Sequence, residues 1–221
     1  SQSYRIPRTV HTAAVRWIER TPGRTPVEYY PRDFEGEVRR VAAQWPHSEL
    51  ILKDMQKYLD DGKSVMILAS CAYMLRPLLF QLRREGIPYH NPYRRNKGAW
   101  NPLQSSNRRI TPKDLVLAFL RMSEEGVWTA DDMKKWLAAT RVSGVIQGGR
   151  SNLDGLINDE STGISWERLN NLLTDSAMDA GLSGNLDWLR NNLLASRQKG
   201  AAFAIRVAET HGAETLTKTP Q

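Results

Sequence analysis

The sequence predicts an α/β protein in two parts: an α/β region with a parallel sheet over residues 1–103 and a mostly helical region over residues 104–221. The continuous apolar run Val65–Ala69 is typical of a parallel strand that is buried on both faces. A helical stripe of leucines and a second short apolar run, Ile87–Tyr89, follow it, and this order predicts a right-handed β-α-β crossover. Beyond residue 103 the apolar residues recur at helical spacing, with little strand signal.

The elements before this crossover follow from local patterns. Apolar residues at helical spacing predict a helix over about residues 8–20, for which Pro7 sets the first turn. Val27–Tyr30 is a short β-prone run. Leu50–Leu59 is expected to be a helix that ends at Asp61-Gly62.

The second part contains two repeated start signals for helices. Thr111-Pro112-Lys113-Asp114 and Thr129-Ala130-Asp131-Asp132 each place a threonine three residues before an acid, which predicts a capping box. Further helices are expected over Ile164–Leu173, Leu186–Leu194 and Ala201–Ala208. Four tryptophans lie at helical spacing with leucines and are expected in the core: Trp128, Trp136, Trp166 and Trp188.

Length and composition exclude several classes of protein. A chain of 221 residues suits one large domain or two small ones. No apolar run approaches the roughly 20 residues of a membrane-spanning helix, and no secretory leader opens the sequence, so we expect a cytoplasmic protein without membrane contact. The single cysteine, Cys71, excludes an internal disulfide and is expected to be a small buried hydrophobe.

The positive charge is confined to the first part of the chain. Residues 1–103 contain 17 basic and 10 acidic side chains, whereas residues 104–221 contain 14 of each, so the whole net charge of +7 lies in the first part. This asymmetry is expected where one part of a protein contacts a polyanion. The alternative is a basic surface that serves solubility alone.

The sequence has no complete active site of its own. There is no phosphate-binding loop with the Gly-x-x-x-x-Gly-Lys-Ser/Thr spacing. The four histidines are scattered, and none pairs with a cysteine or acid at metal-ligand spacing, so no metal site is predicted.

A short stretch at the start, Gln2-Ser3-Tyr4-Arg5-Ile6-Pro7, combines groups that bind nucleotides. The ring of Tyr4 could stack on a base, and the guanidinium of Arg5 could grip a phosphate with two hydrogen bonds. In the alternative interpretation, Tyr4 covers a local core and Arg5 is a solvated charge.

This stretch and the helix after it resemble motif IV of the UvrD/Rep/PcrA-type DNA helicases of superfamily 1. The buried run Val65–Ala69, the helix from Arg76 and the ending Gly86-Ile87-Pro88-Tyr89 resemble a second hallmark of that family. The order and the spacing of the two motifs both fit over roughly residues 1–90.

The resemblance implies an ATP-dependent translocase with two RecA-like motor domains that bind ATP and Mg²⁺ between them. Residues 1–103 would then be an incomplete second RecA-like motor domain, and residues 104–221 its helical insertion. Gln2, Tyr4 and Arg5 would bind ATP, with Tyr4 on adenine and Arg5 as the catalytic group at the γ-phosphate, where a cation stabilises the transferring phosphoryl group. The implied partners are single-stranded or duplex DNA and the first motor domain of the same parent chain.

Several family features are absent from the sequence. The phosphate loop, the acidic Mg²⁺-binding motif and the later motifs of the second motor domain are missing, so we expect a fragment that neither hydrolyses ATP nor unwinds DNA alone. Family members often carry Arg-x-Asn after the strand, and the corresponding positions here are Ser70 and Ala72.

The segment after Tyr89 combines cations with aromatic rings, as proteins that bind single strands do. We predict DNA contacts at Arg76, Tyr93, Arg94, Arg95, Lys97 and Trp100. The alternative is an exposed basic linker whose aromatic residues anchor it to the neighbouring domain.

Two further functions remain open at this point. The basic first part could be a non-enzymatic nucleic-acid-binding module that works without ATP. The charge-balanced second part could be a protein-interaction module that docks a partner or restrains a motor domain.

Overall fold

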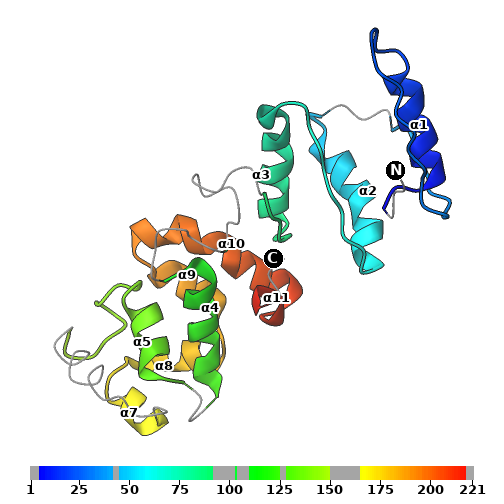
Figure 1. Cartoon of the computed structure of the whole chain (residues 1–221). Helices are drawn as coiled ribbons and strands as arrows, with labels where there is room; N and C mark the ends of the chain where they lie inside the picture. Colours follow the sequence, from blue (N-terminus) through cyan, green and yellow to red (C-terminus); the bar gives the residue numbers. More distant parts are fainter. Residues whose placement is uncertain are drawn as a thin grey trace. The chain divides into compact units, whose positions relative to one another are not determined.

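The computed structural model describes most of the chain (Figure 1): residues 5–41, 45–91, 103, 110–124, 128–149 and 165–217. Its contacts divide the chain into two compact units, Ser1–Gln44 and Trp45–Gln221. Each unit is described by itself.

The first unit is built around α1 (Arg8–Ile18), which confirms the helix expected there. Pro7 stands at the N-cap with an extended backbone and leads directly into the helix. None of residues 5–41 is buried, although the unit contains many apolar side chains. So small a unit cannot bury enough apolar surface to be stable alone, and its apolar side chains stay in contact with solvent.

The second unit opens with two helices that pack on each other: α2 (Ser48–Asp60) and α3 (Arg76–Arg84), the latter preceded by the short 3₁₀ helix η1 (Ala72–Leu75). Their shared core is small and consists of Leu52 from α2 with Leu78 and Leu82 from α3. The predicted helices are therefore confirmed, and each buries one apolar stripe against the other.

The end of α3 explains why glycine stands at position 86. Gly86 has a φ of 69°, a conformation that favours glycine, and a Cβ there would lie 2.9 Å from the backbone oxygen of Arg206. The next amide, that of Ile87, donates a hydrogen bond of 2.8 Å back to the carbonyl of Leu82. This arrangement is a Schellman-type helix end.

The predicted parallel sheet is wrong for the residues that the structure describes. They are mostly helical and contain no sheet, and the β-type pairs between described residues include the isolated bridges Thr140–Leu193 and Ile146–Leu173. This overturns the expected α/β class with an incomplete RecA-like domain. The physical reason lies in Val65–Ala69, which is extended but has no neighbouring strand within the described ranges to complete its hydrogen bonds.

The side chains of Val65 to Leu68 alternate between half-buried and exposed, as the side chains of a strand do. Val65 and Ile67 are half-buried, and Ile67 packs against the core of α2 and α3. Met66 and Leu68 point the other way and are 84% and 82% exposed. The apolar run is therefore buried on one side only, not on both as its composition predicts.

The rest of the second unit is a helical bundle around one large core. Its helices are α4 (Pro112–Leu120), η2 (Arg121–Ser123), α5 (Ala130–Leu137), α7 (Trp166–Asn170), α8 (Asp175–Leu182), α9 (Leu186–Asn192), α10 (Ala195–His211) and α11 (Glu214–Thr217). The helix α4 packs on α5, α8 and α10, and α10 also contacts α3, α9 and α11. Both predicted capping boxes are confirmed, at Thr111 with Asp114 and at Thr129 with Asp132.

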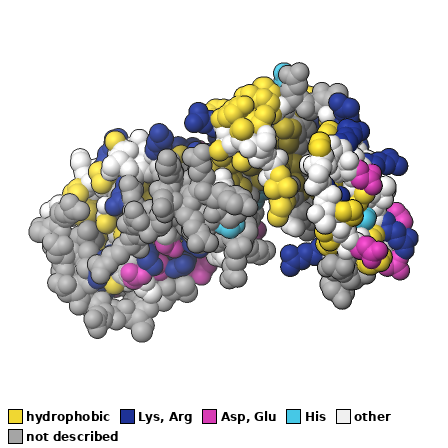
Figure 2. Space-filling model, turned by 45° about the horizontal axis from the view of Figure 1, so that its top comes forward, with side chains coloured by type: hydrophobic (Ala, Val, Ile, Leu, Met, Phe, Trp, Pro, Cys, Tyr) yellow, Lys and Arg dark blue, Asp and Glu magenta, His cyan; other side chains and the backbone are white. Residues whose placement is uncertain are grey.

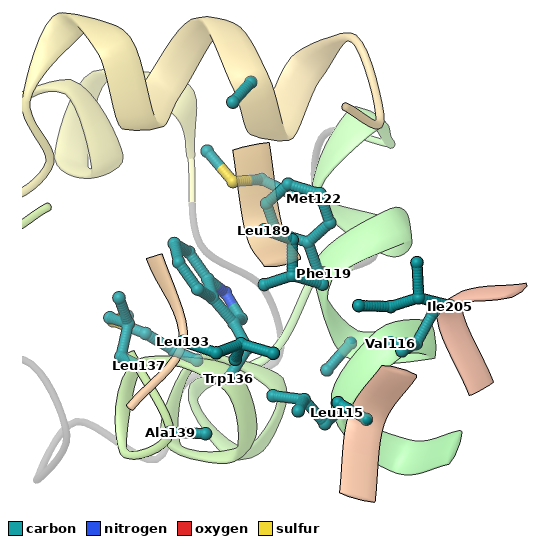
Figure 3. Packing of buried hydrophobic residues seen from close by; sticks show 14 of the residues in the cluster. Leu115, Val116, Phe119, Met122, Trp136, Leu137, Ala139, Leu189, Leu193 and Ile205 are labelled. Atoms are coloured by element: carbon teal, nitrogen blue, oxygen red, sulfur yellow. The ribbon is translucent and has the colours of Figure 1, made fainter. Parts of the chain in front are cut away.

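Aromatic rings occupy the middle of the bundle. The indole of Trp136 lies among side chains from α4, α5 and α9 (Figure 3). Its ring centroid is 5.5 Å from that of Phe119 and 5.9 Å from that of Trp128, and all three residues are fully buried. The core expectation is thus confirmed for Trp128 and Trp136. It holds in part for Trp188 and is wrong for Trp166, which is exposed.

The two capping boxes allow a matched stability test. Asp132 is buried and also forms an ion pair of 2.6 Å with Arg121, whereas Asp114 is half-buried and caps its helix without such a partner in the described structure. We expect Asp114→Ala to lower the free energy of unfolding by about 1 kcal/mol, the typical value of a cap. Asp132→Ala should cost about 2–3 kcal/mol, because it also removes a charged hydrogen bond between the buried carboxylate and the exposed guanidinium of Arg121. Urea unfolding measures both, and equal losses would show that the ion pair adds nothing.

Candidate functional site

The structure describes only two of the residues that the sequence assigns to function, Arg5 and Arg76. The others lie outside the described residues, namely Gln2, Tyr4, Tyr93, Arg94, Arg95, Lys97 and Trp100. The site is therefore built from the two positions that are described and from what surrounds them.

Arg5 is exposed and stands three residues before the start of α1. The chain on its C-terminal side is fixed by two backbone hydrogen bonds: Arg32 donates to the carbonyl of Ile6 at 2.8 Å, and Arg8 donates to that of Phe34 at 3.0 Å. The side chain of Arg8 forms ion pairs with Asp33 and Glu35. The cation of Arg8 therefore holds the local structure together, while that of Arg5 stands at the surface.

The first unit also contains an open apolar groove of about 710 Å³. It lies along α1 and is lined by Ile6, Val10, Ala14, Ile18 and other residues up to Tyr29. At one place the ring of His11 stacks on that of Tyr29, with centroids 5.8 Å apart. The groove is suited to an apolar or aromatic group. Its described lining includes the charged residues Glu19 and Arg24, but these two alone do not identify a ligand.

Arg76 lies at the first position of α3, beside a smaller hollow of about 300 Å³. The hollow is lined by Ala72, Leu75, Arg76, Leu79, Phe80, Arg83 and Asn91. Arg76, Phe80 and Arg83 are four and three residues apart, so they share one face of the helix. All three are exposed, and the ring of Phe80 keeps 68% of its surface in solvent.

The electrostatic setting of this face is positive. Its two arginines have no ion pair within the described ranges, and the acid that follows α3, Glu85, pairs with Arg84 at 3.1 Å. Tyr73 in η1 adds a second exposed ring, which meets Trp45 edge to face at 5.5 Å. Hydrophobic side chains also gather in the upper middle of the surface shown in Figure 2. A cationic surface with accessible rings suits an anionic ligand that has flat groups.

Arg83 connects this face to the helical bundle. Its Nε donates a hydrogen bond of 2.8 Å to the hydroxyl of Tyr89, and its guanidinium lies over the same ring at 5.9 Å. Tyr89 in turn contacts Phe203 of α10, with ring centroids 6.0 Å apart. The arginine is therefore held in place by a side chain that the core itself positions.

Burial raises the pKa of the Tyr89 hydroxyl above its ordinary value of 10.0, and the charge and hydrogen bond of Arg83 act in the opposite direction. The folded state therefore holds the phenolic proton more tightly than the unfolded state, so the stabilisation is complete below about pH 10 and is lost as the pH rises through the folded-state pKa. We expect the free energy of unfolding of the unmodified chain to fall more steeply above about pH 10 than that of Tyr89→Phe. Urea unfolding across the alkaline range measures this difference, and parallel curves would contradict it.

Sequence reasoning missed Phe80 and Arg83. The available signal was the spacing of Arg76, Phe80 and Arg83 on one helical face, which the leucine stripe on the other face obscured. Cys71 was assigned to the interior and is exposed instead, because the segment before η1 is covered on one side only.

No group of three or more His, Cys, Asp or Glu side chains is placed to hold a metal ion among the described residues. None of the described helices has the length and apolar character needed to cross a membrane.

Comparison with known proteins adds no neighbour: no family model, curated protein or solved structure matches this chain.

Proposed function

We propose that this chain is part of an ATP-dependent DNA helicase of the UvrD/Rep/PcrA type. Tyr4 and Arg5, with Gln2, contribute to ATP binding, and Arg5 acts on the γ-phosphate. The phosphate-binding loop and the Mg²⁺ ligands, which this sequence lacks, belong to another part of the complete protein. The observation that carries the proposal is the order of two motifs along the chain: Gln2–Arg5 precedes α1 in the sequence, and Gly86–Tyr89 follows α3.

The positions of the helices support this assignment. The first motif is followed at once by α1, which begins at Arg8, and the second begins where α3 ends. Arg5 is exposed, as a group that reaches a nucleotide held by another domain must be. The proposal concerns these motifs and not a sheet, because the described residues contain none.

The electrostatics of the first 103 residues also favour DNA as the partner. Their excess of seven positive charges is of the sign that attracts a phosphate backbone. The cations at 94, 95 and 97 also lie close together in the sequence, as is expected of a segment that contacts a phosphate backbone.

ATPase assays test the proposal. We expect the 221-residue chain alone to show no ATP turnover and the complete product of its gene to hydrolyse ATP faster when single-stranded DNA is added. Turnover by the chain alone would contradict the division of the site between domains. A complete gene product with no DNA-stimulated ATPase activity would contradict the proposed function.

A non-enzymatic nucleic-acid-binding module is the second candidate, and the exposed cations of α3 favour it. It predicts that the complete gene product binds single strands with strong salt dependence and that ATP changes nothing. The same ATPase assay therefore separates the two candidates.

A further inference from the structure

We infer that the exposed face of α3 is a stacking platform for single-stranded DNA, with Phe80 as the base-stacking ring and with Arg76 and Arg83 as the phosphate contacts. The choice of DNA over RNA rests on the proposed function. The platform itself rests on the geometry of α3 and does not require ATP hydrolysis.

The ring of Phe80 is accessible to a ligand. Phe80 projects from the middle of α3 with 68% of its surface exposed, opposite the buried stripe of Leu78 and Leu82. A single exposed apolar side chain is ordinary. This one, however, lies beside a hollow of about 300 Å³ that also contains Leu79, so a flat group can rest against the ring on an apolar floor.

Positively charged side chains lie on either side of the Phe80 ring along the helix. Arg76 lies four residues before Phe80 and Arg83 three residues after it, so the two cations are about 10 Å apart along the helix axis. Neither has an ion-pair partner among the described residues. A base on the ring would therefore have a cation near the phosphate on each of its sides, the combination that single-strand binders use.

The charge of the α3 face favours DNA over a protein partner. A protein that docked on Phe80 would have to neutralise Arg76 and Arg83, whereas a nucleic acid supplies both the ring and the negative charges. Neither η1 nor α3 contains an acidic side chain, so nothing on these two helices opposes a phosphate. The charge of this face therefore favours the nucleic acid.

The side chain of Arg83 is held in a fixed position. The hydrogen bond from Arg83 Nε to Tyr89, and the contact of Tyr89 with Phe203, hold one cation in place before any ligand binds. A side chain that is already ordered loses less conformational entropy on binding. The terminal nitrogens of Arg83 still point to no partner in the described structure and can reach a phosphate.

Fluorescence anisotropy of the full chain with a labelled oligo(dT) tests the platform without ATP. We expect Phe80→Ala to weaken binding roughly tenfold or more, because stacking of one base on an aromatic ring is worth about that factor. Phe80→Trp should restore the affinity. Arg76→Gln should lower the slope of log affinity against log salt by about 0.7, the value for one phosphate contact on a single strand.

Leu68→Ala is the matched control, because this aliphatic side chain is 82% exposed in the same unit but cannot stack on a base. We expect it to bind oligo(dT) like the unmodified chain. Circular dichroism of each variant checks that the fold is retained, which a surface position such as Phe80 should allow.

Three results would overturn the inference. Equal affinities for Phe80→Ala and Leu68→Ala would show that the ring of Phe80 does not contact the DNA strand. Failure of Phe80→Trp to restore binding would remove the stacking role, and a preference for oligo(U) over oligo(dT) of equal length would replace DNA by RNA. Binding through Phe80 combined with a gene product lacking ATPase activity would uphold the platform and reject the helicase proposal.

Discussion

Replacing Arg5 with alanine in the complete gene product is expected to lower kcat for ATP hydrolysis by at least about a hundredfold, while the affinity for single-stranded DNA stays nearly the same. An arginine that reaches the γ-phosphate stabilises the charge of the transition state, and arginines in this role are worth factors of about 10³–10⁵. Arg5 is remote in sequence from the proposed DNA contacts, so its loss should not weaken the grip on the strand. A coupled ATPase assay and oligonucleotide binding measure the two effects separately.

Arg20 provides the matched control for this experiment. It is an exposed arginine of the same unit, and its guanidinium lies 4.8 Å from the ring centroid of Trp17. We expect Arg20→Ala to leave both activities unchanged. If Arg5→Ala lowers ATPase activity and DNA binding by the same factor while the fold is retained, Arg5 does not have the proposed role.

Replacing Trp136 with alanine is expected to destabilise the helical bundle by about 3–5 kcal/mol, the range for loss of a large buried side chain. Trp136 is fully buried, and the rings of Phe119, Trp128 and Trp188 all lie within 6.4 Å of it, centroid to centroid. Domains are stable by only about 5–15 kcal/mol in total, so the loss would remove much of the margin. Thermal unfolding followed by circular dichroism measures it.

Two further variants make this prediction specific. The indole nitrogen of Trp136 is buried and has no hydrogen-bond partner within the described structure. Trp136→Phe removes this unsatisfied donor and leaves a smaller cavity, so it should cost clearly less than Trp136→Ala. Trp17→Ala, at a ring that is 71% exposed, should change the free energy of unfolding by no more than about 0.5 kcal/mol. Similar melting of Trp136→Ala and Trp17→Ala would contradict the burial of Trp136.

Helix starts and ends were predictable where the signal lies within a few residues. Thr111 and Thr129 each bond to an acid three positions later, so the sequence contains both halves of the interaction. Gly86 ends α3 for an equally local reason, its positive φ. The helix α8 (Asp175–Leu182) was not predicted, because its alanines and glycine give a weak apolar stripe.

The strand at Val65–Ala69 failed for a different reason. The apolar run predicted a buried parallel strand, but a strand exists only where a second strand supplies its hydrogen bonds. No pattern within the run specifies that second strand. The same limit applies to Cys71, whose exposure depends on what covers the segment and not on the residue type.

In the candidate site, too, one residue was predicted from the sequence and another was identified only from the structure. Arg76 was predicted as a DNA contact from the sequence, because it lies in the segment that resembles a helicase motif. Phe80 looked like one more apolar residue of an amphipathic helix, and only its exposed fraction in the structure separates it from Leu78 and Leu82.

The sequence by itself determined the positions of most helices, the two capping boxes and the basic character of the first 103 residues. These features depend on residues within one or two helical turns of each other. The tertiary structure alone decided that no sheet forms among the described residues, that Trp136 is central and Trp166 exposed, and that α3 turns Phe80 toward solvent between two arginines. Those outcomes depend on contacts between segments far apart in the chain, whose free energy no local pattern contains.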